Sequence, residues 1–244
     1  MVKKSAFSLN SIICGGDSDM GSLGKSGIIV TKDKGKIKYE PITNDVHGFE
    51  DGLRKGEVSL DVEHGALYDK DGNPIVGYQG NEHSIPVDER LLQVQGGTFT
   101  HFHPDKDFGG TLSMADLRTF SKSQLNELRA VSGQGYLYSV KATENLDRDK
   151  LEKWVNKNQK LAQKNLNAAY ESALKKAVTP LKSGPHKGKV KLTSPSTGKV
   201  IYRNPMTPKQ AVAFARRYSV QMFDKMYKKN LSKLGLTYTA TKKL

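Results

Sequence analysis

The alternation of apolar and polar positions predicts short β-strands in the middle of the chain. Apolar residues alternate with polar ones over residues 58–68, stop at the turn-forming run 69–73 and resume over 74–79. Two strand-like segments on either side of a short Asp/Gly/Asn turn are typical of a β-hairpin. A pair of glycines at 96–97 then precedes a further predicted strand over residues 98–103.

Weaker signals complete the first 145 residues. The pattern predicts strands at 27–31 and 36–39, a short helix or turn at 87–92, helices at 113–120 and 123–129, and a closing hairpin or final strand at 133–140. We therefore expect an α/β domain over residues 46–145, preceded by a poorly ordered or accessory segment at 1–45.

After residue 145 the apolar spacing changes to the three-and-four period of an amphipathic helix. Long helices are expected over residues 146–178 and 207–234, with Thr207 as the N-cap of the second and Pro208 in its first turn. A basic hairpin at 187–202 lies between them. Residues 146–244 are thus expected to form a mainly helical C-terminal extension, which either packs on the α/β domain or projects as an arm.

Charge is distributed unevenly between the two parts. The formal net charge is +14, yet residues 146–244 hold 23 basic and 5 acidic side chains, a net charge of +18, and residues 1–145 have a net charge of −4. A strongly basic segment indicates an anionic partner, either nucleic acid or an acidic protein surface, unless it is a solvated lysine-rich face. Because lysine outnumbers arginine there, non-specific attraction to phosphate is favoured over bidentate base recognition.

Neither a membrane span nor a secretory signal is expected. No apolar run approaches about 18 residues. The weakly apolar stretch before Cys14 is interrupted by Ser8, Asn10 and Ser11, and no small-residue cleavage pattern follows it. Cys14 is the single cysteine, which excludes an internal disulfide and fits a reducing compartment.

The candidate chemistry lies at the end of the predicted strand 98–103. His101 and His103 are two residues apart, so an extended chain places both imidazoles on one face. Ser113 and Asp116 lie where the next helix is expected to begin. Two histidines, one carboxylate and an open fourth position would form a catalytic zinc site. The alternative for Ser113 and Asp116 is a capping box that satisfies backbone N–H groups at the helix end.

Residues 97–117 carry His-x-His-Pro followed by Ser-x-x-Asp-Leu, and this run resembles the signature of JAB/MPN (JAMM) metallopeptidase domains. The similarity is greatest to the bacterial and phage type, which includes RadC-like proteins and domains attached to phage head-morphogenesis proteins. It covers roughly residues 56–142. The resemblance implies a JAB/MPN-like mixed sheet flanked by helices.

The same resemblance implies a bound Zn²⁺ and a hydrolytic reaction. The zinc ligands would be His101, His103, Asp116 and a water molecule. Ser113 would donate a hydrogen bond to the oxyanion or hold the water. The expected substrate is a protein, often the C-terminus of a ubiquitin-like protein, which is cleaved at a peptide or isopeptide bond.

The family pattern also requires an upstream glutamate as the proton acceptor. Glu63 is assigned to this role because it leads directly into the predicted hairpin. Glu57, Glu82 and Glu89 are weaker candidates because none leads as directly into such a hairpin.

One departure from the family concerns the loop between the histidines and the helix. Nine residues separate His103 from Ser113, more than the family usually has. Either the glycines of this loop allow it to bulge and bring Asp116 back to the histidines, or the insertion displaces Asp116. In the second case the site would be inactive, unless Asp105 or Asp107 served as a substitute ligand.

Two functions follow as expectations. The first is a zinc metallopeptidase or isopeptidase encoded by a phage or prophage, which would work in the cytoplasm of the host cell or in the virion. A role in removing ubiquitin-like conjugates is a variant of it. The second is a minor head or morphogenesis protein that uses the JAB fold as a scaffold. Its basic region 146–244 would then contact DNA, the capsid or the portal.

Overall fold

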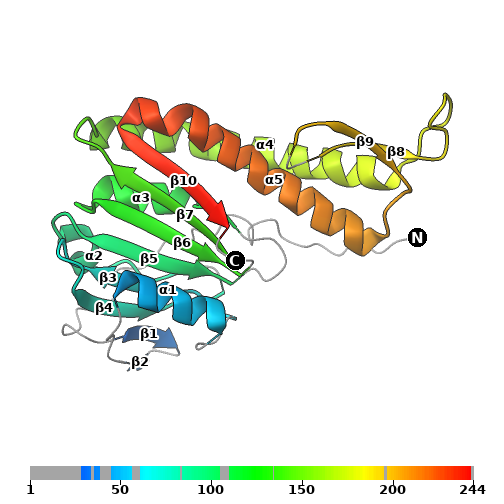
Figure 1. The fold of residues 1–244 in the computed structure, drawn as a ribbon. Coiled ribbons are helices and arrows are strands. Elements are labelled where there is room, and N and C mark those ends of the chain that lie inside the picture. Colours follow the sequence, from blue (N-terminus) through cyan, green and yellow to red (C-terminus); the bar gives the residue numbers. More distant parts are fainter. Residues whose placement is uncertain are drawn as a thin grey trace.

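One large mixed sheet organises the part of the chain that the computed structural model describes, which comprises residues 29–33, 36–38, 45–56, 61–82, 84–104, 110–133, 135–194 and 197–242 (Figure 1). The sheet has eight strands in the order β10-β7-β6-β5-β3-β4-β1-β2. Their bounds are β1 Ile29–Asp33, β2 Lys36–Lys38, β3 His64–Tyr68, β4 Pro74–Gln79, β5 Thr98–His103, β6 Glu127–Ser132, β7 Tyr136–Ala142 and β10 Leu236–Lys242. The β5–β6 and β1–β4 pairs are parallel and the others antiparallel, so the predicted α/β class is confirmed.

Helices cover both faces of this sheet. They are α1 Val46–Lys55, α2 Glu89–Gln93, α3 Met114–Lys122, α4 Arg148–Val178 and α5 Pro208–Asn230, with a 3-10 turn at Leu231–Leu234. Leu53 of α1 packs on Phe102 of β5 and on Val131 and Leu137 of β6 and β7. The opposite face carries the larger core, to which α3, α4 and α5 contribute. In the described part of the chain, no helix combines the length and hydropathy that a bilayer crossing requires.

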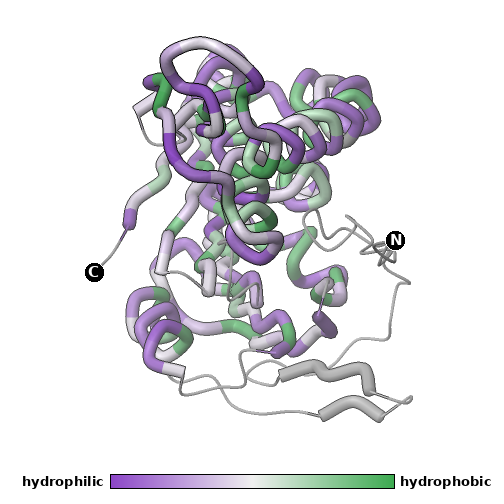
Figure 2. The backbone as a smooth tube through the Cα atoms, turned by 90° about the vertical axis from the view of Figure 1, so that its right-hand side faces the viewer, coloured by the Kyte–Doolittle hydropathy of each residue, from purple (hydrophilic) through white to green (hydrophobic). Residues whose placement is uncertain are grey.

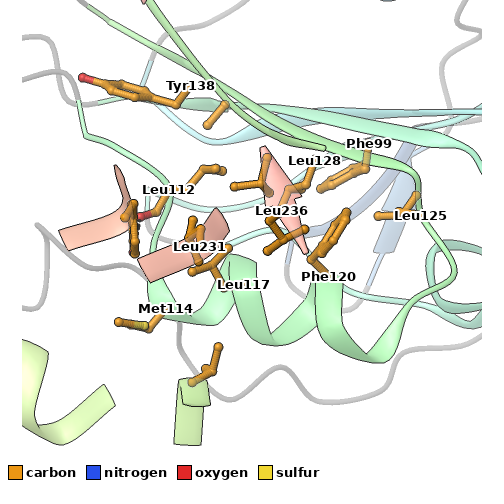
Figure 3. Packing of buried hydrophobic residues seen from close by; sticks show 14 of the residues in the cluster. Phe99, Leu112, Met114, Leu117, Phe120, Leu125, Leu128, Tyr138, Leu231 and Leu236 are labelled. Atoms are coloured by element: carbon orange, nitrogen blue, oxygen red, sulfur yellow. Dashed lines mark hydrogen bonds between the residues drawn. The ribbon is translucent and has the colours of Figure 1, made fainter. Parts of the chain in front are cut away.

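The crossover from β5 to β6 positions the candidate site. Because β5 and β6 are parallel, the chain between them must cross one face of the sheet, and α3 is that connection. Met114, Leu117 and Phe120 recur every third residue along α3 and belong to the same buried core, in which Leu117 and Phe120 point toward the apolar side chains of the strands (Figure 3). This apolar stripe fixes α3 on the same face of the sheet as Phe99 of β5.

Several predicted elements are confirmed, one predicted helix is wrong, and one strand was not predicted. The hairpin β3–β4, strand β5, strand β7 and helices α4 and α5 lie where the pattern predicts them. The helix expected at 123–129 is wrong: Ser123 ends α3, and β6 begins at Glu127 in register with Thr98 of β5. The spacing of Leu125 and Leu128 imitates a helical period, but Leu125 fills the core from the loop before β6 and Leu128 fills it from β6 itself. Strand β10 was not predicted.

The predictions for the N-terminal region concern residues that lie mostly outside the described part of the chain. Of segment 1–45, the structure describes only the backbone of β1 and β2 and residue Asp45. Residues 57–60 also lie outside it, and with them Glu57 and the beginning of the strand predicted at 58–68. Strand β3 begins at His64.

The C-terminal region both packs on the sheet and projects from it. Strand β10 pairs with β7 along its whole length, from Leu236 opposite Ala142 to Lys242 opposite Tyr136. The helices α4 and α5 lie side by side, and their ends farther from the sheet carry the hairpin of β8 Val190–Thr193 and β9 Val200–Arg203 (Figure 1). This far end has a small core of its own, formed by Ala177, Val190, Leu192, Met206 and Ala211.

Candidate metal centre

Strand β5 places the two histidines in the interior of the sheet. It lies between β3 and β6, and successive side chains point to opposite faces. Phe99, His101 and His103 therefore share the face that α3 covers. The rings of Phe99 and His101 stack at 5.5 Å between centroids, and His101 is only 2% exposed. A buried imidazole on a central strand has little freedom to move, so its nitrogen atoms point in a fixed direction, as the nitrogen of a metal-binding histidine must.

Helix α3 brings Asp116 to the histidines. The Nε2 atoms of His101 and His103 are 2.9 Å apart. Oδ1 of Asp116 lies 3.3 Å from Nε2 of His101, and Oδ2 lies 3.7 Å from Nε2 of His103. The long loop between His103 and Ser113 thus does return Asp116 to the histidines. Asp105 and Asp107, the substitute ligands considered from the sequence, lie outside the described residues.

Ser113 and Asp116 also form the capping box that was the structural alternative. The backbone N–H of Ser113 donates to Oδ2 of Asp116 at 2.6 Å, and the backbone N–H of Asp116 donates to Oγ of Ser113 at 3.0 Å. The two interpretations are compatible, because the cap fixes one carboxylate oxygen of Asp116 and leaves the other facing His101. The Ser113 hydroxyl accepts a hydrogen bond here, and its expected role in catalysis stays a prediction.

The carbonyl of Gly110 orients the second histidine. Nδ1 of His103 lies 3.2 Å from this carbonyl oxygen, so Nδ1 carries the proton and donates it. In the neutral ring Nε2 then has a free lone pair, and it points toward His101 and Asp116. A Cβ atom at position 110 would lie 3.2 Å from the same Nδ1, which makes glycine the residue that permits this close approach.

Glu63 is buried immediately before β3. Extending the β3–β5 register by two residues from the Gly65–His101 pair places Glu63 opposite His103, on the face of the sheet that carries the histidines. Its backbone is fixed by hydrogen bonds to Gly80 and Asn81, each 2.8 Å long. Burial raises the pKa of Glu63 to about 8, while His101 lowers it and Asp116 raises it. The Glu63 carboxyl group is therefore close enough to His101 and Asp116 to interact with both electrostatically.

Burial and mutual charge also shift the pKa values of the cluster. For Asp116, burial alone would raise the pKa, but the adjacent His101 lowers it to about 2. For His101, burial lowers the pKa and the charge of Asp116 more than compensates, so the pKa is raised. For His103, burial followed by repulsion from His101 lowers the pKa to about 4. Near neutral pH, Asp116 is therefore a carboxylate and His103 is a neutral imidazole, which are the forms that bind metals.

These three side chains can hold a metal ion. One donor atom from each lies within 4.8 Å of the other two, and no other group of this kind occurs among the residues that the structure describes. Nδ1 of His101 supports the fit, because it is buried without a hydrogen bond of good geometry, although the backbone of Arg129 is near enough to raise the pKa of the ring. If Nε2 of His101 binds a cation, Nδ1 must carry the proton. The backbone carbonyl of Arg129 is then the nearby acceptor for that proton.

Sequence reasoning missed the residues that hold the loop in front of α3. The hydroxyl of Tyr227 in α5 donates to the carbonyl of Leu112 at 2.8 Å, and the hydroxyls of Thr111 and Tyr238 are 2.9 Å apart. Tyr227 is fully buried. Nothing local in the sequence pointed to a hydrogen-bond partner 115 positions earlier. The C-terminal region therefore supports the segment that leads into Ser113 and Asp116.

Gly65 of β3 is a second residue that sequence reasoning missed. It lies opposite His101 in the register. A Cβ atom at this position would come within 2.8 Å of the Phe99 ring and 2.9 Å of Ile85. The absence of a side chain makes room for the ring that stacks on His101.

Comparison of the chain with protein-family models, with curated proteins and with solved structures gave no match. The fold and the site define an α/β protein with a buried His–His–Asp cluster that can bind a metal ion.

Proposed function

We propose that this protein is a zinc-dependent peptidase or isopeptidase of the JAB/MPN type. The observation that carries the proposal is the convergence of His101, His103 and Asp116, with a buried glutamate beside them. Two imidazoles and one carboxylate are a donor set that zinc accepts in hydrolytic sites, with one position left for water, and metal binding at His101 would displace any proton from its Nε2 atom. The resemblance of residues 97–117 to the JAMM signature supports the same assignment.

The residues have distinct roles in this proposal. His101, His103 and Asp116 would hold the ion, whose contribution is to lower the pKa of a bound water and to polarise the scissile carbonyl. Glu63 would accept the proton of the attacking water and deliver it to the leaving amine. Its raised pKa suits a group that must both take up and release a proton near neutral pH. Ser113 would donate a hydrogen bond to the oxyanion once its hydroxyl proton turns toward the substrate.

Metal content tests the first half of the proposal. Protein purified without added metal, then dialysed against zinc, is expected to hold one zinc atom per chain by elemental analysis. His101→Ala and Asp116→Asn are expected to lose it. His47→Ala is the matched control, because His47 is exposed and lies on the opposite face of the sheet, in α1. Equal zinc content in all four proteins would remove the cluster as the metal site.

Turnover tests the second half separately. The zinc-loaded protein is expected to cleave peptide or isopeptide bonds at the C-terminus of a ubiquitin-like substrate, and chelation is expected to abolish cleavage. Glu63→Gln should retain zinc and lose turnover by a factor of about 10² or more, the usual contribution of a positioned general base. Full turnover in Glu63→Gln would eliminate Glu63 as the base while leaving the metal site intact. The proposed setting, a phage or prophage protein in the host cytoplasm or the virion, is supported by the resemblance alone.

A further inference from the structure

The far end of the α4–α5 pair contains a long stretch without acidic residues. Residues 172–223, here called the distal basic unit, hold 11 Lys and Arg and no Asp or Glu. Ten of these cations are exposed, namely Lys175, Lys176, Lys182, Lys187, Lys189, Lys191, Lys199, Arg203, Lys209 and Arg217. The charge is therefore displayed to solvent and is not neutralised by acidic neighbours in the sequence.

The unit lies where a large partner can reach it. It comprises the second half of α4, the β8–β9 hairpin and the first part of α5, at the end of the molecule away from the main sheet (Figure 1). Viewed toward this end, hydrophilic residues are interspersed with hydrophobic ones along the helices and the hairpin (Figure 2). Its small core uses the buried side chains of β8, Val190 and Leu192, so the cations are left on the outside.

The outer face of the hairpin combines aromatic rings with lysine. In the β8–β9 register Leu192 pairs with Ile201 and Lys191 pairs with Tyr202, so Lys191 and Tyr202 lie on the face opposite the buried Leu192. Tyr202 is 40% exposed, and the ring of His186 stacks on it at 3.7 Å between centroids and 16° between planes. Val200, on the same face, is 52% exposed.

We propose that the distal basic unit binds nucleic acid, with phosphates held by its lysines and an unpaired base stacked on the Tyr202–His186 pair. A regularly spaced polyanion fits a surface on which cations occur in every segment and acids are absent. Stacked rings beside lysines are the elements from which sequence-tolerant strand binding is built. An acidic protein is the less suitable partner, because lysine is depleted in protein interfaces, whereas eight of the eleven cations here are lysine. This inference does not depend on the metal centre.

Fluorescence anisotropy of the full-length protein with a labelled oligothymidylate and with a labelled duplex of matching length tests the inference. The triple variant Lys187→Gln, Lys191→Gln, Lys199→Gln removes three charges from the unit. Its control, Lys150→Gln, Lys153→Gln, Lys157→Gln, removes the same charge from exposed positions at the other end of α4. The wild type should bind both probes with an affinity that falls steeply between about 50 and 200 mM salt.

The expected differences are specific to each variant. The distal triple variant should reduce the slope of log affinity against log salt on the duplex by up to about 3, since each lost phosphate contact contributes about 0.9. The control should leave the slope unchanged. Tyr202→Leu should weaken oligothymidylate binding by about tenfold and leave duplex binding unchanged, because only an unpaired base can stack.

Three results would overturn the inference. The first is no binding of either probe at low salt, and the second is an equal loss in the two triple variants, which would assign the effect to net charge alone. The third is displacement of the probes by poly-glutamate at the same concentration of charge as by unlabelled DNA, which would assign the surface to an acidic protein. If Tyr202→Leu bound oligothymidylate as tightly as the wild type, the proposed stacking of a base on the Tyr202–His186 pair would be wrong.

Discussion

Replacing Glu63 by glutamine should stabilise the metal-free protein, and the gain should increase with pH. Glu63 is 5% exposed, and burial raises its pKa to about 8 from a reference value of 4.5. In the unfolded chain the carboxyl group ionises from its reference value upward. Between the two pKa values only the unfolded chain loses the proton, so increasing pH favours unfolding. Glutamine cannot ionise and does not carry this penalty.

The size of the effect follows from the width of this pH interval. Each pH unit inside it lowers the free energy of unfolding by about 1.4 kcal/mol. The contribution of Glu63 to the free energy of unfolding is most favourable below pH 4.5, where the carboxyl group is protonated in both states. This contribution decreases progressively between pH 4.5 and pH 8, and above pH 8 it no longer changes with pH. Between about pH 5 and about pH 8, the wild type should therefore lose about 4 kcal/mol relative to Glu63→Gln, which is an upper value because water entry into the site reduces it.

Urea unfolding of chelator-treated protein at these two pH values measures the difference. Subtracting the variant from the wild type at each pH cancels the titration of every group that does not interact with Glu63, so the difference reports Glu63 together with its coupling to His101 and Asp116. Glu89→Gln is the control, because it makes the same chemical change at an exposed position at the beginning of α2. A difference between wild type and Glu63→Gln that is the same at both pH values would show that Glu63 is ionised in the folded state. The assigned proton chemistry of Glu63 would then fail.

Three further substitutions test the surroundings of the site by urea unfolding. Tyr227→Phe removes only a hydroxyl and should cost about 1–3 kcal/mol, because the Leu112 carbonyl is left buried and unpaired; no loss would mean that the hydrogen bond is dispensable. Glu50→Gln should cost about 3 kcal/mol, because Glu50 is fully buried and its two oxygens accept from Arg129 at 2.6 and 2.9 Å. Stability equal to wild type would rule out this ion pair as a support of the sheet. Gly65→Ala should cost about 1–3 kcal/mol through overpacking and should weaken zinc binding, whereas a neutral result would show that the ring above it can shift freely.

The cluster of His101, His103 and Asp116 could be predicted because short-range sequence patterns determine the direction of each of these side chains. The alternation along β5 fixes the two imidazoles on one face whatever the rest of the fold does. Asp116 could be placed because a Ser-x-x-Asp pattern marks a helix beginning, and the cap that forms there sets the direction of the carboxylate. The length of the preceding loop left two outcomes open. Only the tertiary packing of α3 on the sheet decides between them.

Other features depend on contacts between distant segments, which no local pattern contains. Helical spacing at 123–129 is misleading, because Leu125 and Leu128 fill the core equally well from a loop and from the parallel strand that follows it. Strand β10 alternates threonine with tyrosine and alanine, a weak signal at the end of a chain, and it becomes a strand through pairing with β7. Glu50 reaches Thr100 and Arg129, 50 and 79 positions away, so its burial cannot be read from α1 alone.

Helix α5 connects the two functional proposals physically. It begins at Thr207 and Pro208, beside the hairpin of the distal basic unit, and its far end carries Tyr227, whose hydroxyl holds the loop before Asp116. At 1.5 Å per residue, the helical stretch between these points spans roughly 30 Å. The metal centre and the nucleic-acid surface are thus too far apart to act on the same few atoms, yet they share one continuous and partly buried element. A macromolecular partner bound at the distal unit would be held at a fixed offset from the metal centre, because both sites are attached to the same helix.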